Sequence, residues 1–114
     1  MHPILPLLTT LFALAPPITA HSGSLTYFHP GLGACGYQNT DNDPLVAISA
    51  ALYDRTNSCG RWIKVKGPKG TRNVKVRDRC EGCAEWDLDL GPKMFKEVVG
   101  DLGIGRAKGT WEWA

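Results

Sequence analysis

Apolar and polar residues alternate along five short stretches of this chain, a pattern typical of strands with one buried face. The stretches are residues 22–29, 61–66, 71–78, 87–90 and 106–113. In the third, the alternation predicts that Val74, Val76 and Asp78 share one face. That strand would therefore end in a carboxylate at the rim of the core.

Two other stretches lack this alternation. Residues 45–53 are apolar on nearly every face, which predicts a buried strand, a buried helix, or a strand that passes into a helix. Residues 91–99 predict the clearest helix, because Pro92 suits a first helical turn and Gly100 suits the stop. About six short strands with one good helix predict an all-β fold, a small closed barrel without exposed strand edges.

Residues 1–20 resemble a secretory signal peptide. Residues 4–15 form a mostly apolar run, and small residues suited to cleavage follow before His21. The run is too short to span a membrane, and no later stretch is apolar enough. We therefore expect a secreted, extracellular protein with one domain over residues 21–114 and no membrane partner.

A domain of this size has a marginal core, so covalent cross-links are expected. The chain has four cysteines, and an even number in a small exported chain predicts two disulfides. They are Cys35, Cys59, Cys80 and Cys83, which leave three pairings open. Zinc binding or thioredoxin-like redox chemistry is a weaker interpretation, because two of the cysteines are scattered and the close pair follows a strand.

The formal net charge is +2, and basic residues are scattered among acidic ones, so nothing indicates a nucleic-acid partner. The charge is compatible with attraction to an anionic wall polymer. Cleavage before His21 would give a terminal histidine, as in copper-dependent polysaccharide monooxygenases, but nothing else of that family is visible and a disordered terminus is expected. Residues 39–43 lack the glycine and closing glutamate of a calcium loop. We expect no metal and no other cofactor.

Several motifs occur in an order that resembles the double-psi β-barrel family, which includes rare lipoprotein A-like domains, barwin-like proteins and the first domain of expansins. They are Leu-Thr-Tyr-Phe at 25–28, Gly-Ala-Cys-Gly-Tyr at 33–37, Cys-Gly-Arg-Trp-Ile-Lys-Val at 59–65, Val-Arg-Asp-Arg-Cys-Glu-Gly-Cys at 76–83, Asp-Leu-Gly-Pro-Lys-Met-Phe at 89–95 and Thr-Trp-Glu-Trp at 110–113. Single-domain secreted fungal loosenins are most similar. The resemblance implies a six-stranded double-psi β-barrel with one or two short helices that binds and loosens wall polysaccharide: cellulose, chitin or peptidoglycan.

The resemblance also implies which residues form the site. The expansin groove has a threonine and two aspartates, matched here by Thr26, Asp78 and Asp89. Asp89 aligns with the general acid of the related family 45 glycoside hydrolases. Expansin-like members lack the hydrolase's base, and no acid stands in an obvious equivalent position here, so action without hydrolysis is favoured. Cys80 replaces a tyrosine of some bacterial expansins, and Asp87 replaces a histidine of plant expansins.

Each of these residues also has a purely structural interpretation. Asp89 could cap the following helix, and Asp78 could accept hydrogen bonds from backbone N–H groups of a loop. A threonine in a strand, such as Thr26, is ordinary.

A glycan-binding groove should present aromatic rings on which sugar rings can stack. We favour Trp86, which lies in a loop beside the acids, then Tyr37 and Tyr27. At least one tryptophan of the last stretch is expected in the core. The full set of candidates is Tyr27, Tyr37, Trp62, Trp86, Trp111 and Trp113.

By analogy with the family, Cys35 pairs with Cys59, which leaves Cys80 with Cys83; pairing of Cys59 with Cys80 stays open. Two rival functions also stay open. Some small exported members resemble papain inhibitors or act as effectors, and the partner would then be a cysteine protease. The protein could also be a weak endoglucanase or lytic transglycosylase. Such an enzyme would need a second acid, and Asp41 and Asp43 are the available ones. In each case we expect a monomer.

Overall fold

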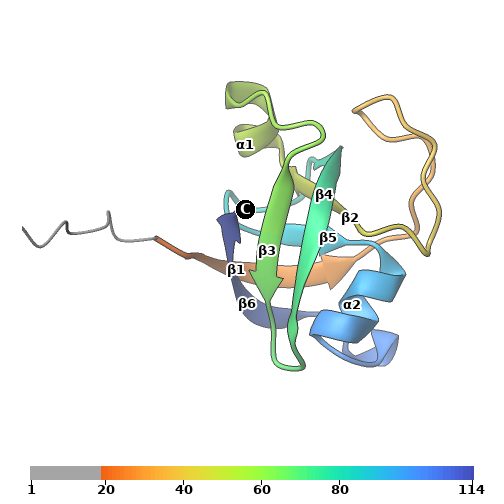
Figure 1. The fold of residues 1–114 in the computed structure, drawn as a ribbon, viewed down its shortest axis with the longest axis vertical. Coiled ribbons are helices and arrows are strands. Elements are labelled where there is room, and N and C mark those ends of the chain that lie inside the picture. The colour runs from red at the N-terminus through yellow and green to blue at the C-terminus, as the bar shows by residue number, and fades with distance from the viewer. Residues whose placement is uncertain (1–18) are drawn as a thin grey trace, which may run out of the picture.

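The computed structural model describes residues 19–114, which form a closed barrel of six strands (Figure 1). The strands are β1 (His21–Tyr27), β2 (Leu45–Ser49), β3 (Trp62–Lys66), β4 (Thr71–Cys80), β5 (Leu88–Leu90) and β6 (Ala107–Trp113). Their order around the barrel is β1-β5-β2-β4-β3-β6, and β6 closes on β1. The prediction of a small all-β barrel is confirmed. Residues 1–18 of the expected signal peptide lie outside the described residues.

Two strand pairs are parallel, β1 with β5 and β2 with β4, and the other four are antiparallel. A parallel pair requires a long crossover connection, which a tight turn cannot supply. The connection from β2 to β4 contains helix α1 (Ala50–Arg55) and strand β3. The connection from β1 to β5 contains β2, α1, β3 and β4, so the two crossovers interlock.

Ser49 is the point at which β2 passes into α1. Its Oγ accepts a hydrogen bond from the Leu52 N–H at 3.1 Å, which caps the helix, and donates one to the Glu85 carbonyl at 2.8 Å. Residues 45–53 therefore follow the third predicted alternative, a strand that becomes a helix. The second helix, α2 (Pro92–Val98), begins at the proline as predicted, and a short 3-10 helix, η1 (Leu102–Ile104), follows.

Inward-facing side chains of the strands and both helices form a single core. Trp111 is only 1% exposed, and its Nε1 donates a hydrogen bond to the Trp86 carbonyl at 2.9 Å, so the expected core tryptophan is confirmed. In Figure 1, α1 lies at the top of the barrel and α2 at the lower right. Within residues 19–114, no helix is both long and apolar enough to cross a membrane.

Two disulfides cross-link the barrel. Cys35 is bonded to Cys59 and Cys80 to Cys83, so the pairing expected by analogy is confirmed. The first bond ties the loop after β1 to the segment after α1, and the second closes the turn after β4. Both bonds lie next to segments that carry predicted site residues.

Candidate functional site

A bulge in β4 determines where Asp78 lies. Val46 of β2 pairs with Val76. The next residue of β2, Ala47, pairs with Asp78, so Arg77 is an extra residue in β4. The prediction that Val76 and Asp78 share a face is therefore wrong, because one inserted residue reverses the faces of those that follow.

The bulge brings the predicted polar residues into one row. Ala47 also pairs with Asp89 of β5, and Asp89 pairs with Thr26 of β1. Since directly paired residues project to the same face of a sheet, Asp78, Ala47, Asp89 and Thr26 form a row across four strands, which we call the polar row. Two strand spacings separate the backbones of the two acids, about 10 Å.

Asp89 is partly buried in the polar row. Its Oδ1 accepts a hydrogen bond from the Thr26 hydroxyl at 2.9 Å. Burial raises the pKa of the Asp89 carboxyl above its ordinary value; the Thr26 hydrogen bond opposes this shift, the charge of Asp78 adds to it, and the charge of Arg106 opposes it. The cap residue of α2 is Gly91, with no side-chain cap hydrogen bond, so the structure gives Asp89 no helix-capping contact.

Asp78 holds the glycine-rich loop against the barrel. Its Oδ1 accepts hydrogen bonds from the Ala34 N–H at 2.9 Å and the Arg79 N–H at 2.8 Å. Gly33 packs so closely on β4 that a Cβ there would lie 2.4 Å from the Arg77 carbonyl oxygen. The structural interpretation of Asp78 therefore has a geometric basis, and its role toward a ligand stays a prediction.

The three aromatic residues predicted as sugar platforms lie in different surroundings. Trp86 stacks on His21, with ring centroids 4.0 Å apart and planes inclined by 1°, so one of its faces is covered. His21 is the first residue of β1, so the expectation that it belongs to a disordered terminus is wrong. Tyr27 rests against Phe95 with centroids 4.9 Å apart. Tyr37 is 51% exposed.

Trp62, which the sequence offered as an aromatic candidate without favouring it, is also exposed. It is 42% exposed and lines a hollow of about 320 Å³ together with Tyr37. The strand pattern contained a signal for it, because Ile63 and Val65 point inward and Trp62 must therefore point outward.

No family model matches the chain. It is similar to expansin-like protein 2 of Dictyostelium discoideum, with 32% identity over 79 residues that cover 60% of this chain and 19% of that protein. It is also similar to an Asp-to-Asn variant of Clavibacter michiganensis expansin in complex with cellohexaose, with 29% identity, a TM-score of 0.75, and 84% of this chain and 50% of that one covered. A third similarity, to the Streptomyces papain inhibitor, has 30% identity and a TM-score of 0.73 and covers 88% of this chain and 99% of that one. The chain belongs to the double-psi β-barrel family, as an expansin-like domain.

This expansin-like domain matches only part of the longer relatives. It spans about a fifth of the Dictyostelium protein and half of the Clavibacter chain, whereas it spans nearly all of the papain inhibitor. What the longer proteins do as wholes therefore enters only as support for a proposal.

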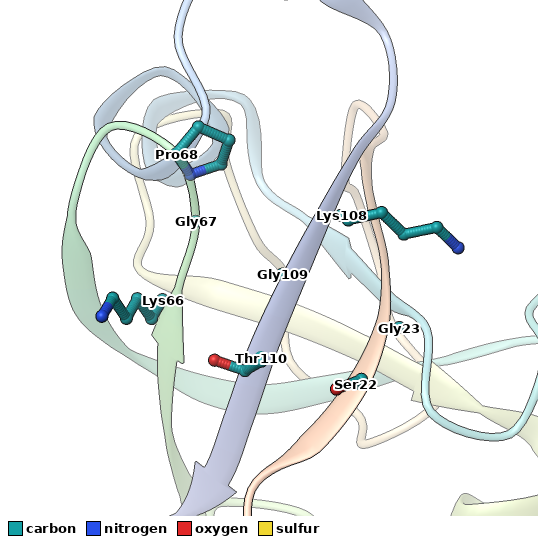
Figure 2. A pocket seen from close by; sticks show the side chains of 8 residues that line it. All are labelled: Ser22, Gly23, Lys66, Gly67, Pro68, Lys108, Gly109 and Thr110. Carbon is teal, nitrogen blue, oxygen red and sulfur yellow. The ribbon is translucent and has the colours of Figure 1, made fainter.

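A wide hollow of about 660 Å³ lies over β1, β3 and β6 of the expansin-like domain (Figure 2). Figure 2 shows the side chains of Lys66 and Lys108 extending in opposite directions, away from Gly109 in the floor. Among residues 19–114, no carboxylate, aromatic ring or predicted site residue lines this hollow, so it is not the candidate site. Its lining is Ser22, Gly23, Lys66, Gly67, Pro68, Lys108, Gly109 and Thr110.

The raised pKa of Asp89 predicts how the stability of the expansin-like domain depends on pH. The folded protein holds this proton to a higher pH than the unfolded chain does, so the stabilisation is complete below the ordinary aspartate pKa of about 3.9 and is lost as pH rises through the folded-state pKa. Asp89→Asn cannot ionise. At pH 7 we expect its Tm to exceed that of the wild type by about 2–5 °C.

Thermal unfolding of both proteins between pH 3 and pH 8 measures this difference, which should vanish at the acid end. Glu81→Gln is the control, because it removes a carboxylate that is 87% exposed. A Tm of Asp89→Asn below that of the wild type at pH 7 would contradict the prediction.

Proposed function

We propose that this expansin-like domain is a secreted, monomeric, loosenin-like protein that binds wall polysaccharide along the polar row and loosens contacts between glycan chains without cleaving them. The observation that carries the proposal is the polar row itself, in which Asp89 has a raised pKa and a hydrogen bond from Thr26. A carboxyl that stays protonated to a higher pH can donate a hydrogen bond to a sugar oxygen. Such a donor competes with the hydrogen bonds between neighbouring glycan chains.

The surroundings of the other acids support action without hydrolysis. Cleavage of a glycosidic bond normally requires two carboxyl groups with separate acid and base roles. The Asp78 oxygen Oδ1 already accepts two backbone N–H groups. The two spare acids are engaged in their own loop: Asp41 Oδ2 lies 3.0 Å from His29 Nδ1, and Asp43 Oδ2 accepts the Thr40 N–H at 2.7 Å.

The similar Clavibacter expansin in complex with cellohexaose supports a β-linked glucan as the polymer. Cellulose is therefore the first substrate to test, with chitin and peptidoglycan beside it. The two disulfides support an extracellular location, because such bonds persist in oxidising compartments.

The test compares the wild type with Asp89→Ala on each polymer. We expect the wild type to sediment with cellulose and weaken a fibre network while releasing no reducing ends. Asp89→Ala should lose the weakening about tenfold or more, because alanine has no side-chain group that can donate a hydrogen bond to a sugar oxygen. Glu112→Gln, which removes a carboxylate from β6 outside the polar row, should behave as the wild type.

Two outcomes would overturn this assignment. Reducing ends that the wild type releases and Asp89→Ala does not would show hydrolysis. Unchanged loosening by Asp89→Ala would remove Asp89 from the function.

Similarity to the Streptomyces papain inhibitor over 99% of that chain supports a second candidate, inhibition of a cysteine protease. Titration of papain activity with the mature protein tests it. Inhibition without binding to any of the three polymers would favour this alternative over polysaccharide loosening.

A further inference from the structure

Tyr37 and Trp62 line a hollow that no residue of the polar row shares. We call it the aromatic hollow. Its volume is about 320 Å³, within the range of about 300–1,000 Å³ that is usual for small-molecule sites. The hollow lies along β4 next to the Asp78 end of the polar row, because Arg77 lines it and directly precedes Asp78. The lining residues are Tyr37, Gln38, Asn39, Asp43, Pro44, Leu45, Trp62, Lys75 and Arg77.

Each aromatic ring of the hollow has a cation beside it. The Arg77 guanidinium carbon is 3.9 Å from the centroid of the Tyr37 ring, and Lys75 Nζ is 5.6 Å from that of Trp62. The backbone explains both contacts. Trp62 and Lys75 are direct cross-strand partners, and Arg77 is the inserted residue of the β4 bulge. The bulge that adds Asp78 to the polar row thus also supplies Arg77 to the aromatic hollow.

The charge of the aromatic hollow is positive and largely uncompensated. None of the ion pairs found within residues 19–114 includes Lys75 or Arg77. Asp43 is the one acid in the lining, and its Oδ2 accepts the Thr40 N–H of its own loop. With two cations beside two exposed rings, the aromatic hollow suits a ligand that carries a negative charge and can stack on an aromatic ring.

We propose that the aromatic hollow binds a carboxylated sugar, a uronic acid unit of an anionic polysaccharide. The apolar face of the sugar ring stacks on Trp62, because Arg77 already lies over the Tyr37 ring. The carboxylate pairs with the guanidinium fork of Arg77 and with the Lys75 ammonium group. This site is separate from the polar row and does not depend on whether the polar row loosens a neutral glycan.

De-esterified polygalacturonate is the probe, and its fully methyl-esterified form is the matched neutral polymer. Affinity electrophoresis or calorimetry should show that the wild type binds the charged form about tenfold more tightly. Trp62→Ala, which leaves the charge unchanged, should weaken that binding about fivefold, and Arg77→Gln should do the same. Lys93→Gln, an equal loss of charge on α2, should bind as the wild type.

Unchanged binding by Trp62→Ala would overturn the proposal, as would equal weakening by Lys93→Gln and Arg77→Gln, which would indicate attraction to net charge alone. Tighter binding to single-stranded RNA than to polygalacturonate would overturn it too. Circular dichroism checks the fold of each variant. If Arg77→Gln disturbs the loop at Tyr37, Lys75→Gln replaces it, because the Lys75 backbone N–H keeps its bond to the Pro44 carbonyl.

Discussion

Alanine in place of Gly23 is expected to destabilise the barrel by about 3 kcal/mol or more. A Cβ at this position would lie 2.1 Å from the carbonyl oxygen of Trp86 and 2.6 Å from its carbonyl carbon. These backbone atoms cannot yield easily. The Trp86 carbonyl accepts the indole N–H of Trp111, and the Asp87 side chain accepts the Ser24 N–H at 2.9 Å.

Thermal or urea unfolding of Gly23→Ala measures the effect, which corresponds to a fall in Tm of roughly 12–24 °C. Gly82→Ala is the matched control, because a Cβ at that glycine meets nothing within 4 Å. Equal stability of Gly23→Ala and the wild type would show that β1 does not approach the Trp86 segment this closely.

Loss of the bond between Cys35 and Cys59 should cost nearly twice as much stability as loss of the bond between Cys80 and Cys83. The first bond joins residues 24 apart and the second joins residues 3 apart. Because a cross-link removes more conformational freedom from the unfolded chain when it closes a longer loop, the expected costs are about 3.5 and about 2 kcal/mol.

Urea unfolding of the double variants Cys35→Ser/Cys59→Ser and Cys80→Ser/Cys83→Ser measures both costs. Addition of a reductant to the wild type should reproduce their combined effect. A greater loss from the second double variant would contradict the ranking, and would mean that the turn after β4 depends on its cross-link for native geometry.

Local patterns in the sequence predicted most of the secondary structure. Period-two alternation located five of the six strands, all except β2, and Pro92 marked the start of α2, because both features depend only on neighbours along the chain. Thr26 and Asp89 lie together, in agreement with the family resemblance, since their strands pair in parallel.

Features that depend on register could not be predicted in this way. Val76 and Asp78 alternate as in a regular strand, and nothing in those residues marks Arg77 as an insertion. The bulge becomes visible only when β4 is aligned with β2. His21 covers one face of the Trp86 ring, and this contact likewise joins segments that are distant in the sequence. The position of Trp86 in a loop was therefore a poor guide to the exposure of its ring.

The place of β1 between β5 and β6 has a consequence for synthesis of the chain. Its partners come late: Thr26 and Asp89, which meet in the polar row, are 63 residues apart, and β6 is the last strand. A chain dominated by such distant contacts folds slowly, and here the barrel cannot close until β6 has been synthesised. A nascent chain that stops before β6 leaves β1 and β3 with unpaired edges, which invite pairing with other chains. Shortening the C-terminus should therefore produce aggregates rather than a smaller stable domain.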